Sequence, residues 1–465
     1  MIESIQNIWR IKDLRLRVLF TFGLLAIYRV GSYVPIPGIN LEALKGWFEQ
    51  NQGSVFGLVD LFTGGNLQNL TIFALGIMPY IPASIILQLL AVVWPYLERL
   101  QKEGEVGRRK INQWTRYGTI MLSMIQGAGI CLWVSKIHTG DQAVVTNPGI
   151  GFFLVTILTL TTGTAFIMWL GEQITERGIG NGISLIIFAG IVARFPHAVV
   201  STAREVLTGE KGLLPMVLLA VAMFAVVAAV VFVERAQRRI PIQYASRVQG
   251  RRVMRGQATF LPLRVNTAGV IPVIFATSLM VLPVTLLRLV YERWPNASLG
   301  AIDRQLQYHM PWYNIVCFLM ILGFCYFYTA IIFNPQDTAE NMKRVGGFIP
   351  GVRPGKPTAQ HINNVLTRLT FAGAIYLGVI WLLPNFLMYG FQLHNLEPAA
   401  VGQFFNRLVP KILLEGLQVK FYFGGTSLLI VVGVAMDTVQ QIESQLVMRH
   451  YDGFLKKTRI KGRRG

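Results

Sequence analysis

Charged residues are scarce in this sequence: they make up 14% of the 465 residues, whereas hydrophobic residues make up 53%. A water-soluble chain of this size carries about 25% charged residues. The hydrophobic residues also gather in blocks close to the roughly 20 residues that a helix needs to cross a bilayer. A lipid-exposed sheet would leave backbone groups unpaired, so we predict a polytopic all-α membrane protein and exclude an ordinary soluble domain.

Ten blocks are candidate transmembrane spans. Two of them are weaker than the rest, because 183–193 is short and 421–436 has glycines near its start. The ten predicted spans are 18–34, 71–97, 117–135, 150–171, 183–193, 213–233, 269–287, 312–333, 369–388 and 421–436.

Ionisable side chains are missing from most of these spans. No Asp, Glu, Lys, Arg or His occurs in 71–94, 117–135, 150–171, 213–233, 269–287 or 312–333. A carrier coupled to protons or ions needs such groups near the middle of the membrane. Their absence argues against a secondary transporter with inverted repeats, which we keep as the alternative, and against a small-molecule substrate.

Signatures of an enzyme are also missing. The glycines of Glu176–Ser184 lack the spacing of a phosphate-binding loop, so we interpret this stretch as a tight turn between two spans. No spacing resembles a zinc site or a catalytic nucleophile. The three cysteines fall inside spans, where we expect packing roles. We therefore predict that the chain is not an enzyme, holds no metal or cofactor, and depends on a partner to power any work.

The net charge of +20 is largely a signal of membrane topology. With ten spans and the N-terminus inside, the cytoplasmic segments hold most of the 43 lysines and arginines, as the positive-inside rule requires. Both termini are then cytoplasmic. Residues 1–17 are basic and are not followed by the short apolar region and cleavage site of a signal peptide, so we expect none.

The loop 234–266 carries more positive charge than membrane orientation requires, with eight arginines and one acidic residue. Alternating Ile240, Ile242 and Tyr244, followed by a turn at Gln249-Gly250, predict a hairpin. A solvated basic loop is one interpretation. We favour a docking surface for an acidic partner, such as an RNA-containing particle or an acidic protein, and keep a membrane protein that only tethers RNA as a third hypothesis.

A second cytoplasmic loop presents a single arginine. In FIPGVRPGKP, residues 348–357, two Pro-Gly pairs bracket Arg353, and such pairs favour turns. An exposed arginine is usually only solvated, but one held between two turns is a candidate for a partner contact.

The second span begins with residues that break helices, namely Gly76, Pro79 and Pro82. Irregular backbone at membrane depth is tolerated only where it faces protein or water. We therefore expect this stretch to face protein or water and not lipid. Ile77 and Ile81 are four residues apart, which predicts that they share one helix face.

Six stretches together resemble the SecY family, the channel subunits of the general secretory translocon. They occur in the family's order, and the resemblance runs from about Val18 to the tail. The stretches are FALGIMPYI (73–81), GEVGRRKINQWTRYGT (104–119), GEQITERGIGNGISLIIFAGIVA (171–193), the arginine loop 234–266, IPGVRPG (349–355) and FYFGGTSLLIVV (421–432).

The resemblance implies ten helices in two inverted five-helix halves around an hourglass pore for unfolded polypeptide. A lateral gate between spans 2 and 3 and spans 7 and 8 would release hydrophobic segments into lipid. The implied partners are the small subunits SecE and SecG and either the SecA motor or a translating ribosome, at the bacterial cytoplasmic membrane. The implied divisions are an N-terminal segment 1–17, a first half 18–195, an outer hinge loop 196–212, a second half 213–442 with loops 234–268 and 334–368, and a basic tail 443–465.

The resemblance also assigns roles to single residues. A ring of aliphatic side chains closes the waist of the pore, where it disfavours water and ions and offers a passing chain nothing to bind. Without the resemblance, ordinary core packing would be the simpler interpretation. The segment 59–70 resembles the plug, which folds back beneath the ring. The implied ring is Ile77, Ile81, Ile187, Ile274 and Ile430, and the implied plug residues are Asp60, Leu61, Phe62, Thr63, Gly64, Gly65 and Asn66.

A polar cluster at the lateral gate and a set of docking arginines are implied as well. Gln126 and Asn266 match two members of the cluster. The third position, usually a hydroxyl residue in the family, is Pro82, which leaves the hydrogen-bond network of the gate in doubt. The implied docking arginines are Arg247, Arg251, Arg252 and Arg353.

Overall fold

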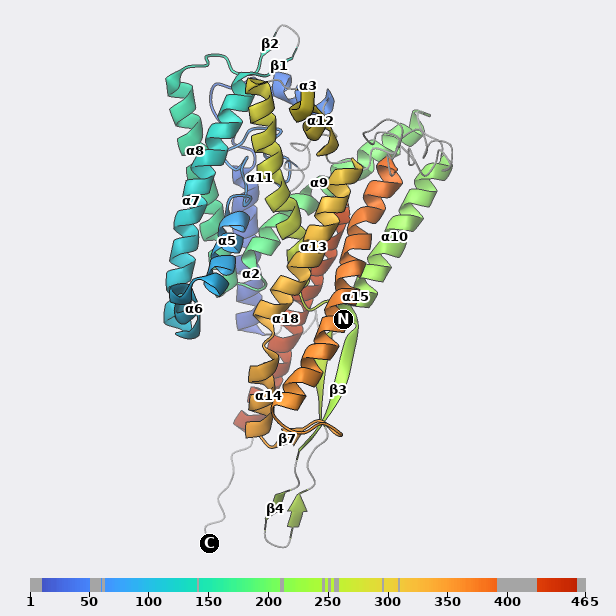
Figure 1. Ribbon diagram of the computed structural model, residues 1–465. Helices are drawn as coiled ribbons and strands as arrows, with labels where there is room; N and C mark the ends of the chain where they lie inside the picture. Colours follow the sequence, from blue (N-terminus) through green and yellow to red (C-terminus); the bar gives the residue numbers. More distant parts are fainter. Residues whose placement is uncertain are drawn as a thin grey trace. The chain divides into compact units, whose positions relative to one another are not determined.

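The computed structural model contains two compact units. Figure 1 labels its helices and strands. Unit 1 contains Met1–Ser201 and Val434–Gly465, and unit 2 contains Thr202–Gly433. The structure describes residues 11–50, 60, 63–139, 142–209, 213–244, 247–249, 252–254, 259–294, 297–307, 310–390 and 425–457.

Unit 1 is built from helices that match the first five predicted spans. Helix α7 packs against both α8 and α5, and α2 packs against α8. Two short strands, β1 (His138–Thr139) and β2 (Gln142–Ala143), pair between α7 and α8. The helices are α2 (Lys12–Gly31), α3 (Leu41–Gln50), α5 (Tyr80–Val93), α6 (Pro95–Lys102), α7 (Glu105–Ser135), α8 (Ile150–Arg177) and α9 (Gly182–Leu207), with the end of α18 (Gly425–Lys457).

Helices α7 and α8 run side by side (Figure 1) and are joined by an ion pair between Arg116 and Glu172. The guanidinium reaches both carboxylate oxygens, with Nε–Oε1 at 2.9 Å and Nη2–Oε2 at 2.7 Å. This paired geometry is the strong form of an arginine–carboxylate contact. It fixes the register of the two long helices near one end of the unit.

The second predicted span is interrupted where the sequence has its helix-breaking residues. Residues 72–79 form turns, helix α5 begins at Tyr80, and the chain bends by 99° between α5 and α6. The bend falls at Trp94, whose backbone is extended because Pro95 follows it. Leu97 and Leu100 then bury the apolar side of α6.

The stretch between α8 and α9 is the tight turn that the sequence predicted. Helix α8 ends at Arg177 and α9 begins at Gly182. The Asn181 side chain accepts hydrogen bonds from the N–H groups of Ile183 and Ser184, at 3.1 and 3.4 Å, and so caps α9. Helix α9 then continues through Pro196 to Leu207, so the stretch 196–207 is helical where a loop was expected.

Unit 2 combines helices with a small sheet. Helix α13 packs against α11 and α15, and α15 also packs against α14. The unit contains α10 (Leu213–Arg235), α11 (Ile271–Arg293), α12 (Ala297–Gln305), α13 (Pro311–Ile332), α14 (Pro335–Arg344), α15 (Lys356–Tyr389), β3 (Gln237–Tyr244), β4 (Arg247–Gln249), β5 (Arg252–Met254), β6 (Thr259–Arg264) and β7 (Gly347–Phe348).

The sheet joins the arginine-rich loop 234–266 to the second cytoplasmic loop. Strand β3 pairs with β6 on one side and with β7 on the other, in antiparallel register. Ile240 and Leu263 of the sheet form one apolar cluster with Ile349 and with Ile362 of α15. The predicted hairpin is confirmed, because β4 and β5 pair from Gln249–Arg252 outward (Figure 1).

The described residues contain five helices long and apolar enough to cross a membrane, or six if the bent pair α5 and α6 is one span. The five lie in α7, α8, α9, the stretch Pro311–Arg344 and α15. The chain is therefore a multi-pass helical membrane protein, and the count of ten spans stays a prediction. The three cysteines are buried free thiols, as their predicted packing role requires.

Candidate functional site

The irregular stretch before α5 is folded by successive three-residue turns. Backbone hydrogen bonds join Gly76 N to Phe73 O at 2.8 Å and Tyr80 N to Ile77 O at 3.0 Å. Ile77 therefore precedes the helix, and the prediction that Ile77 and Ile81 share a helix face was wrong. Both side chains are nevertheless buried.

Pro82 lies in the first turn of α5, which explains how this helix tolerates it. The first N–H groups of any helix have no partner within the helix, so a proline there loses no hydrogen bond. Pro79 is the N-cap residue of the same helix. The prolines thus mark the point where turns give way to helix.

This irregular stretch is covered by protein, as predicted. A Cβ atom on Gly163 of α8 would lie 1.9 Å from the carbonyl oxygen of Ile72, and one on Gly31 of α2 would lie 2.1 Å from the Phe73 ring. Only glycine permits these approaches. The Phe73 ring also stacks between those of Tyr28 and Phe166, with centroids 5.8 and 6.1 Å away.

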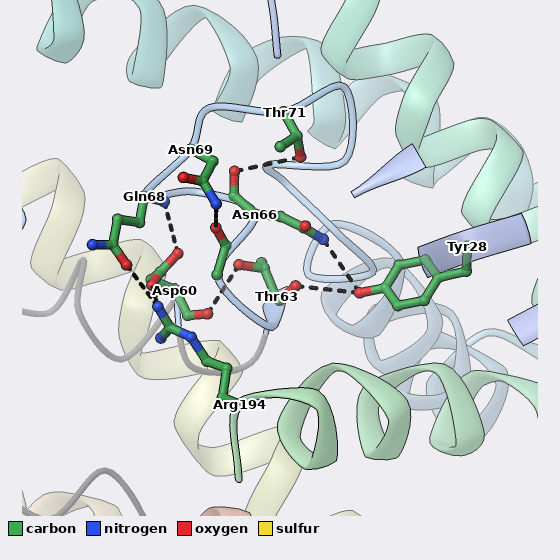
Figure 2. A network of polar contacts seen from close by, with 9 residues as sticks. Tyr28, Asp60, Thr63, Asn66, Gln68, Asn69, Thr71 and Arg194 are labelled. Atoms are coloured by element: carbon green, nitrogen blue, oxygen red, sulfur yellow. Dashed lines mark hydrogen bonds and ion pairs between the residues drawn. The ribbon is translucent and has the colours of Figure 1, made fainter. Parts of the chain in front are cut away.

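A polar network holds the neighbouring segment 60–71 inside unit 1 (Figure 2). The Asp60 carboxylate contacts the Arg194 guanidinium of α9, with Oδ2–Nη2 at 2.8 Å. Its other oxygen accepts a hydrogen bond from the backbone N–H of Gln68 at 2.7 Å. Arg194 Nη2 also donates to the Gln68 side-chain oxygen at 2.7 Å. Asp60, Gln68 and Arg194 therefore form a closed triangle of polar contacts.

Tyr28 of α2 contacts the other side of this segment (Figure 2). Its hydroxyl donates to the carbonyl of Thr63 at 3.2 Å and accepts from the Asn66 amide at 3.3 Å. The N–H of Thr71 donates to the carbonyl of Asn66 at 3.0 Å. All these groups except Arg194 and Gln68 are buried. The polar side chains of the segment are thus satisfied by unit 1.

Burial raises the pKa of the Asp60 carboxyl above its ordinary value. The positive charge of Arg194 and the N–H of Gln68 act in the opposite direction. The side chain of Asp60 is 4% exposed and that of Arg194 is 21% exposed. Removing the arginine would leave the carboxylate buried with no opposite charge in contact with it.

One face of α9 joins the segment to the predicted ring. Ile187, Gly190 and Arg194 are spaced by three and four residues, so they follow one side of the helix. A Cβ atom on Gly64 would lie 2.7 Å from the Cα atom of Gly190. A Cβ atom on Gly76, next to Ile77, would lie 3.0 Å from the Thr63 side chain. The predicted plug therefore packs beside two ring positions.

The five ring isoleucines are all buried, but they belong to both units. Ile77, Ile81 and Ile187 lie in unit 1. Ile274 and Ile430 lie in unit 2. Their closure into one ring stays a prediction.

The predicted plug is described in part. Asp60, Thr63 and Asn66 are buried, and Gly64 and Gly65 have φ angles of 73° and 91°, which suit glycine. Leu61 and Phe62 lie outside the described residues.

The predicted gate residues are likewise divided between the units. Pro82 and Gln126 lie in unit 1, where Pro82 is buried and Gln126 is half-buried on α7. In unit 2, the Asn266 amide nitrogen donates to the carboxylate of buried Glu234 at 2.6 Å and to the carbonyl of Gly269 at 3.2 Å.

The predicted docking arginines that the structure describes lie on the β4–β5 hairpin and on the second loop. Arg353 is exposed, with Gly351 and Gly355 on either side at φ angles of 82° and 104°. Thr358 Oγ1 donates to the Arg353 carbonyl at 2.8 Å and fixes this tip. Arg247 and Arg252 occupy β4 and β5, and Arg251 lies outside the described residues.

The sequence did not predict the roles of three polar residues at these sites, namely Glu234, Arg194 and Tyr28. Glu234 and Arg194 stand at the ends of apolar blocks, where charged residues ordinarily mark the membrane surface. Tyr28 lies within the first span and carries no separate signal. The spacing of Arg194 from Ile187 was the one available clue to its role. Among the residues that the structure describes, no group of His, Cys, Asp and Glu could hold a metal ion.

Comparisons with known proteins agree with the resemblance. The sequence profile of the SecY family matches residues 71–439. The chain is 47% identical over 455 residues to protein translocase subunit SecY of Escherichia coli strain K12, covering 97% of this chain and 96% of that protein. It is 44% identical over 459 residues to the protein of the same name from Aquifex aeolicus, covering 98% of this chain and all of that one.

Two solved structures share the fold. One, reported for the plug domain of a SecY protein that stabilises the closed state of the translocation channel, aligns with a TM-score of 0.63 and 17% identity, over 93% of this chain and 92% of that one. The other is Sec61 in the canine ribosome-channel complex, with a TM-score of 0.58 and 15% identity over the same fractions.

The close contact of Gly64 with Gly190 gives a first prediction. We expect Gly64→Ala to lower the thermal midpoint of the purified protein, because the residue has a positive φ angle and its Cβ would meet the α9 backbone at 2.7 Å. The backbone strain costs about 1–2 kcal/mol, and the crowding adds about 1–3 kcal/mol.

Gly104→Ala is the matched control, because Gly104 has a φ angle of 75° and no atom within 4 Å of a Cβ built there. Thermal unfolding in detergent would compare the two variants. Equal midpoints would mean that the approach of Gly64 to Gly190 is not tight.

Proposed function

Because this chain belongs to the SecY family, we propose that it is the central subunit of a protein-conducting channel. Such a channel passes unfolded secretory polypeptides across the membrane and releases hydrophobic segments sideways into lipid. The observation that carries the proposal is the nearly full-length similarity to bacterial protein translocase subunits. The buried isoleucines and the glycine-rich segment packed beside them support it.

Ile77, Ile81, Ile187, Ile274 and Ile430 form the closing ring of this channel. Aliphatic side chains around a narrow waist exclude water when the pore is empty. They offer no hydrogen bond to a passing polypeptide. The segment of about 59–70 is the plug, and its contacts with α2 and α9 hold it within unit 1.

Ten spans in two inverted halves surround the pore, with the lateral gate between spans 2 and 3 and spans 7 and 8. The helices α2, α5, α7, α8, α9, α10, α11, α13, α15 and α18 would be these spans.

Gln126 and Asn266 would belong to the polar cluster of the gate. The Asn266 amide nitrogen donates to Glu234 and to Gly269. Pro82 cannot contribute a side-chain hydrogen bond, so this gate has fewer polar links than one with a hydroxyl at that position.

The channel works in the bacterial inner membrane with both termini in the cytoplasm. SecE and SecG would brace it, and the SecA motor or a translating ribosome would drive it. The Sec61 channel of similar fold is described in complex with a ribosome. Arg247, Arg251, Arg252 and Arg353 are the docking residues, since they lie on loops with excess positive charge.

The alternatives have weaker support. An inverted-repeat transporter needs ionisable or ion-binding groups within its spans, and the sequence of most spans has none. Flux of a small solute through reconstituted protein without a secretory substrate would favour it. A protein that only tethers RNA would keep its function when the ring isoleucines are changed to polar residues.

The most direct test is crosslinking from the ring to a translocating chain. A photoreactive residue at Ile77, Ile81 or Ile274 should crosslink to a stalled secretory polypeptide in reconstituted membranes. Probes at the exposed positions Leu154 and Leu158 of α8, which is not a gate helix, serve as controls. Equal crosslinking from both sets would contradict a pore lined by the ring.

Replacing Ile77 and Ile81 with serine should make the resting channel conduct ions. Serine hydroxyls favour water at the waist, and a wetted waist conducts. Planar-bilayer conductance without a secretory substrate measures the leak. Leu154→Ser together with Leu158→Ser, on the exposed side of α8, is the control, and an unchanged conductance in the ring variant would contradict the ring.

Reversing the charge at Arg353 should block driven export and leave the fold intact. Arg353 is exposed, so Arg353→Glu removes a partner contact without disturbing the core. We expect reconstituted translocation to fall at least about tenfold, as loss of one charge-assisted contact predicts. Lys356→Glu is the control, because it makes the same charge change three residues away on an exposed position. Equal rates for both variants would show that Arg353 is not a docking residue.

A further inference from the structure

We propose that Arg194 is the residue that positions the plug in its closed place, through its ion pair with Asp60. This inference rests on the proposed role of segment 59–70 as the plug. It adds a specific latch, made of two residues on different elements, that neither the family resemblance nor the ring requires.

Arg194 contacts two separate positions of the segment, Asp60 and Gln68 (Figure 2). One guanidinium nitrogen contacts Asp60 at 2.8 Å and Gln68 at 2.7 Å, so it binds both ends of the stretch between them. The guanidinium also lies against Gly65, where a Cβ atom would come within 3.1 Å of Nε. A larger residue at position 65 would push the arginine away. Arg194 therefore clamps the segment at three points.

The two residues of this latch are buried to different degrees, and their burial makes each costly to remove. The Asp60 side chain is 4% exposed, whereas that of Arg194 is 21% exposed and can be hydrated from its open side. Removing one partner of a buried ion pair leaves the other charge uncompensated, which is far more costly than losing a surface pair. The segment is thus held as long as both charges are present.

The far end of the segment has a different kind of anchor. Ile36 N donates to Leu70 O and Ile72 N donates to Val34 O, both at 3.0 Å. Leu70 has a φ angle of 35°, the one positive value among the described non-glycine residues. Backbone bonds thus fix residues 70–72, whereas side-chain contacts hold Asp60, Thr63, Asn66 and Gln68. When the latch opens, the segment would swing about residues 70–72.

The test measures how often the segment leaves its place. Leu67 is fully buried within it, so a cysteine introduced there reacts with a membrane-impermeant maleimide only when the segment moves out. The Leu67→Cys change is made in full-length protein whose native cysteines, all buried, have been replaced. The labelling rate in proteoliposomes without a substrate reports spontaneous release.

We expect Arg194→Gln and Asp60→Asn each to raise this labelling rate by roughly tenfold or more, because each leaves the remaining charge without its partner. The double variant should be labelled no faster than the faster single variant, since both changes remove the same pair. Arg194→Lys should restore part of the closed state, because it keeps the charge. Arg204→Gln, at an exposed position of the same helix, is the control.

Two outcomes separate this inference from the proposed function. One outcome is that a secretory chain raises labelling of the protein with Asp60 and Arg194 intact, whereas Arg194→Gln leaves labelling without a substrate unchanged. The plug would then move, and the role of the ion pair as its latch would be wrong. If engagement of a secretory chain never raises labelling, the plug assignment itself fails. Additive effects of the two single changes would also overturn the latch, because they would show that the residues act independently.

Discussion

The fold of unit 1 depends on hydrogen bonds to a stretch of irregular backbone that is buried among the spans. The stretch from Gly64 to Pro79 consists of turns and one isolated bridge, yet most of it is buried. In a membrane, such backbone must find every hydrogen bond within the protein. Successive turns supply some of these bonds and the strand-like contacts of Val34 and Ile36 supply others. Gly163 and Gly31 then admit the chain at distances that any side chain would prevent.

The same constraint explains where the charges are. A carboxylate in this surrounding needs an opposite charge and hydrogen-bond donors, and Asp60 has Arg194 and the N–H of Gln68. In unit 2, buried Glu234 accepts from the Asn266 amide. These acids lie beside the apolar spans, not within their uncharged centres. The centres of most spans thus stay without charged side chains.

Several features of the fold could be predicted from the sequence, because each depends on residues that are close together in the chain. The arginine hairpin, the turn at Asn181 and the glycine-flanked tip at Arg353 each follow from turn residues and alternation within a few positions. The helix face assigned to Ile77 and Ile81 was wrong because spacing says nothing about where a helix begins. The pair of Asp60 with Arg194 could not be predicted, since it joins residues 134 positions apart whose own neighbourhoods look like ordinary membrane-surface charges.

The position of these contacts has a mechanical consequence. The hydrogen bonds and the ion pair described for segment 60–71 join it to α2, to α9 and to the loop before α3, all within unit 1. In the proposed channel, release of the plug therefore requires these contacts within unit 1 to break.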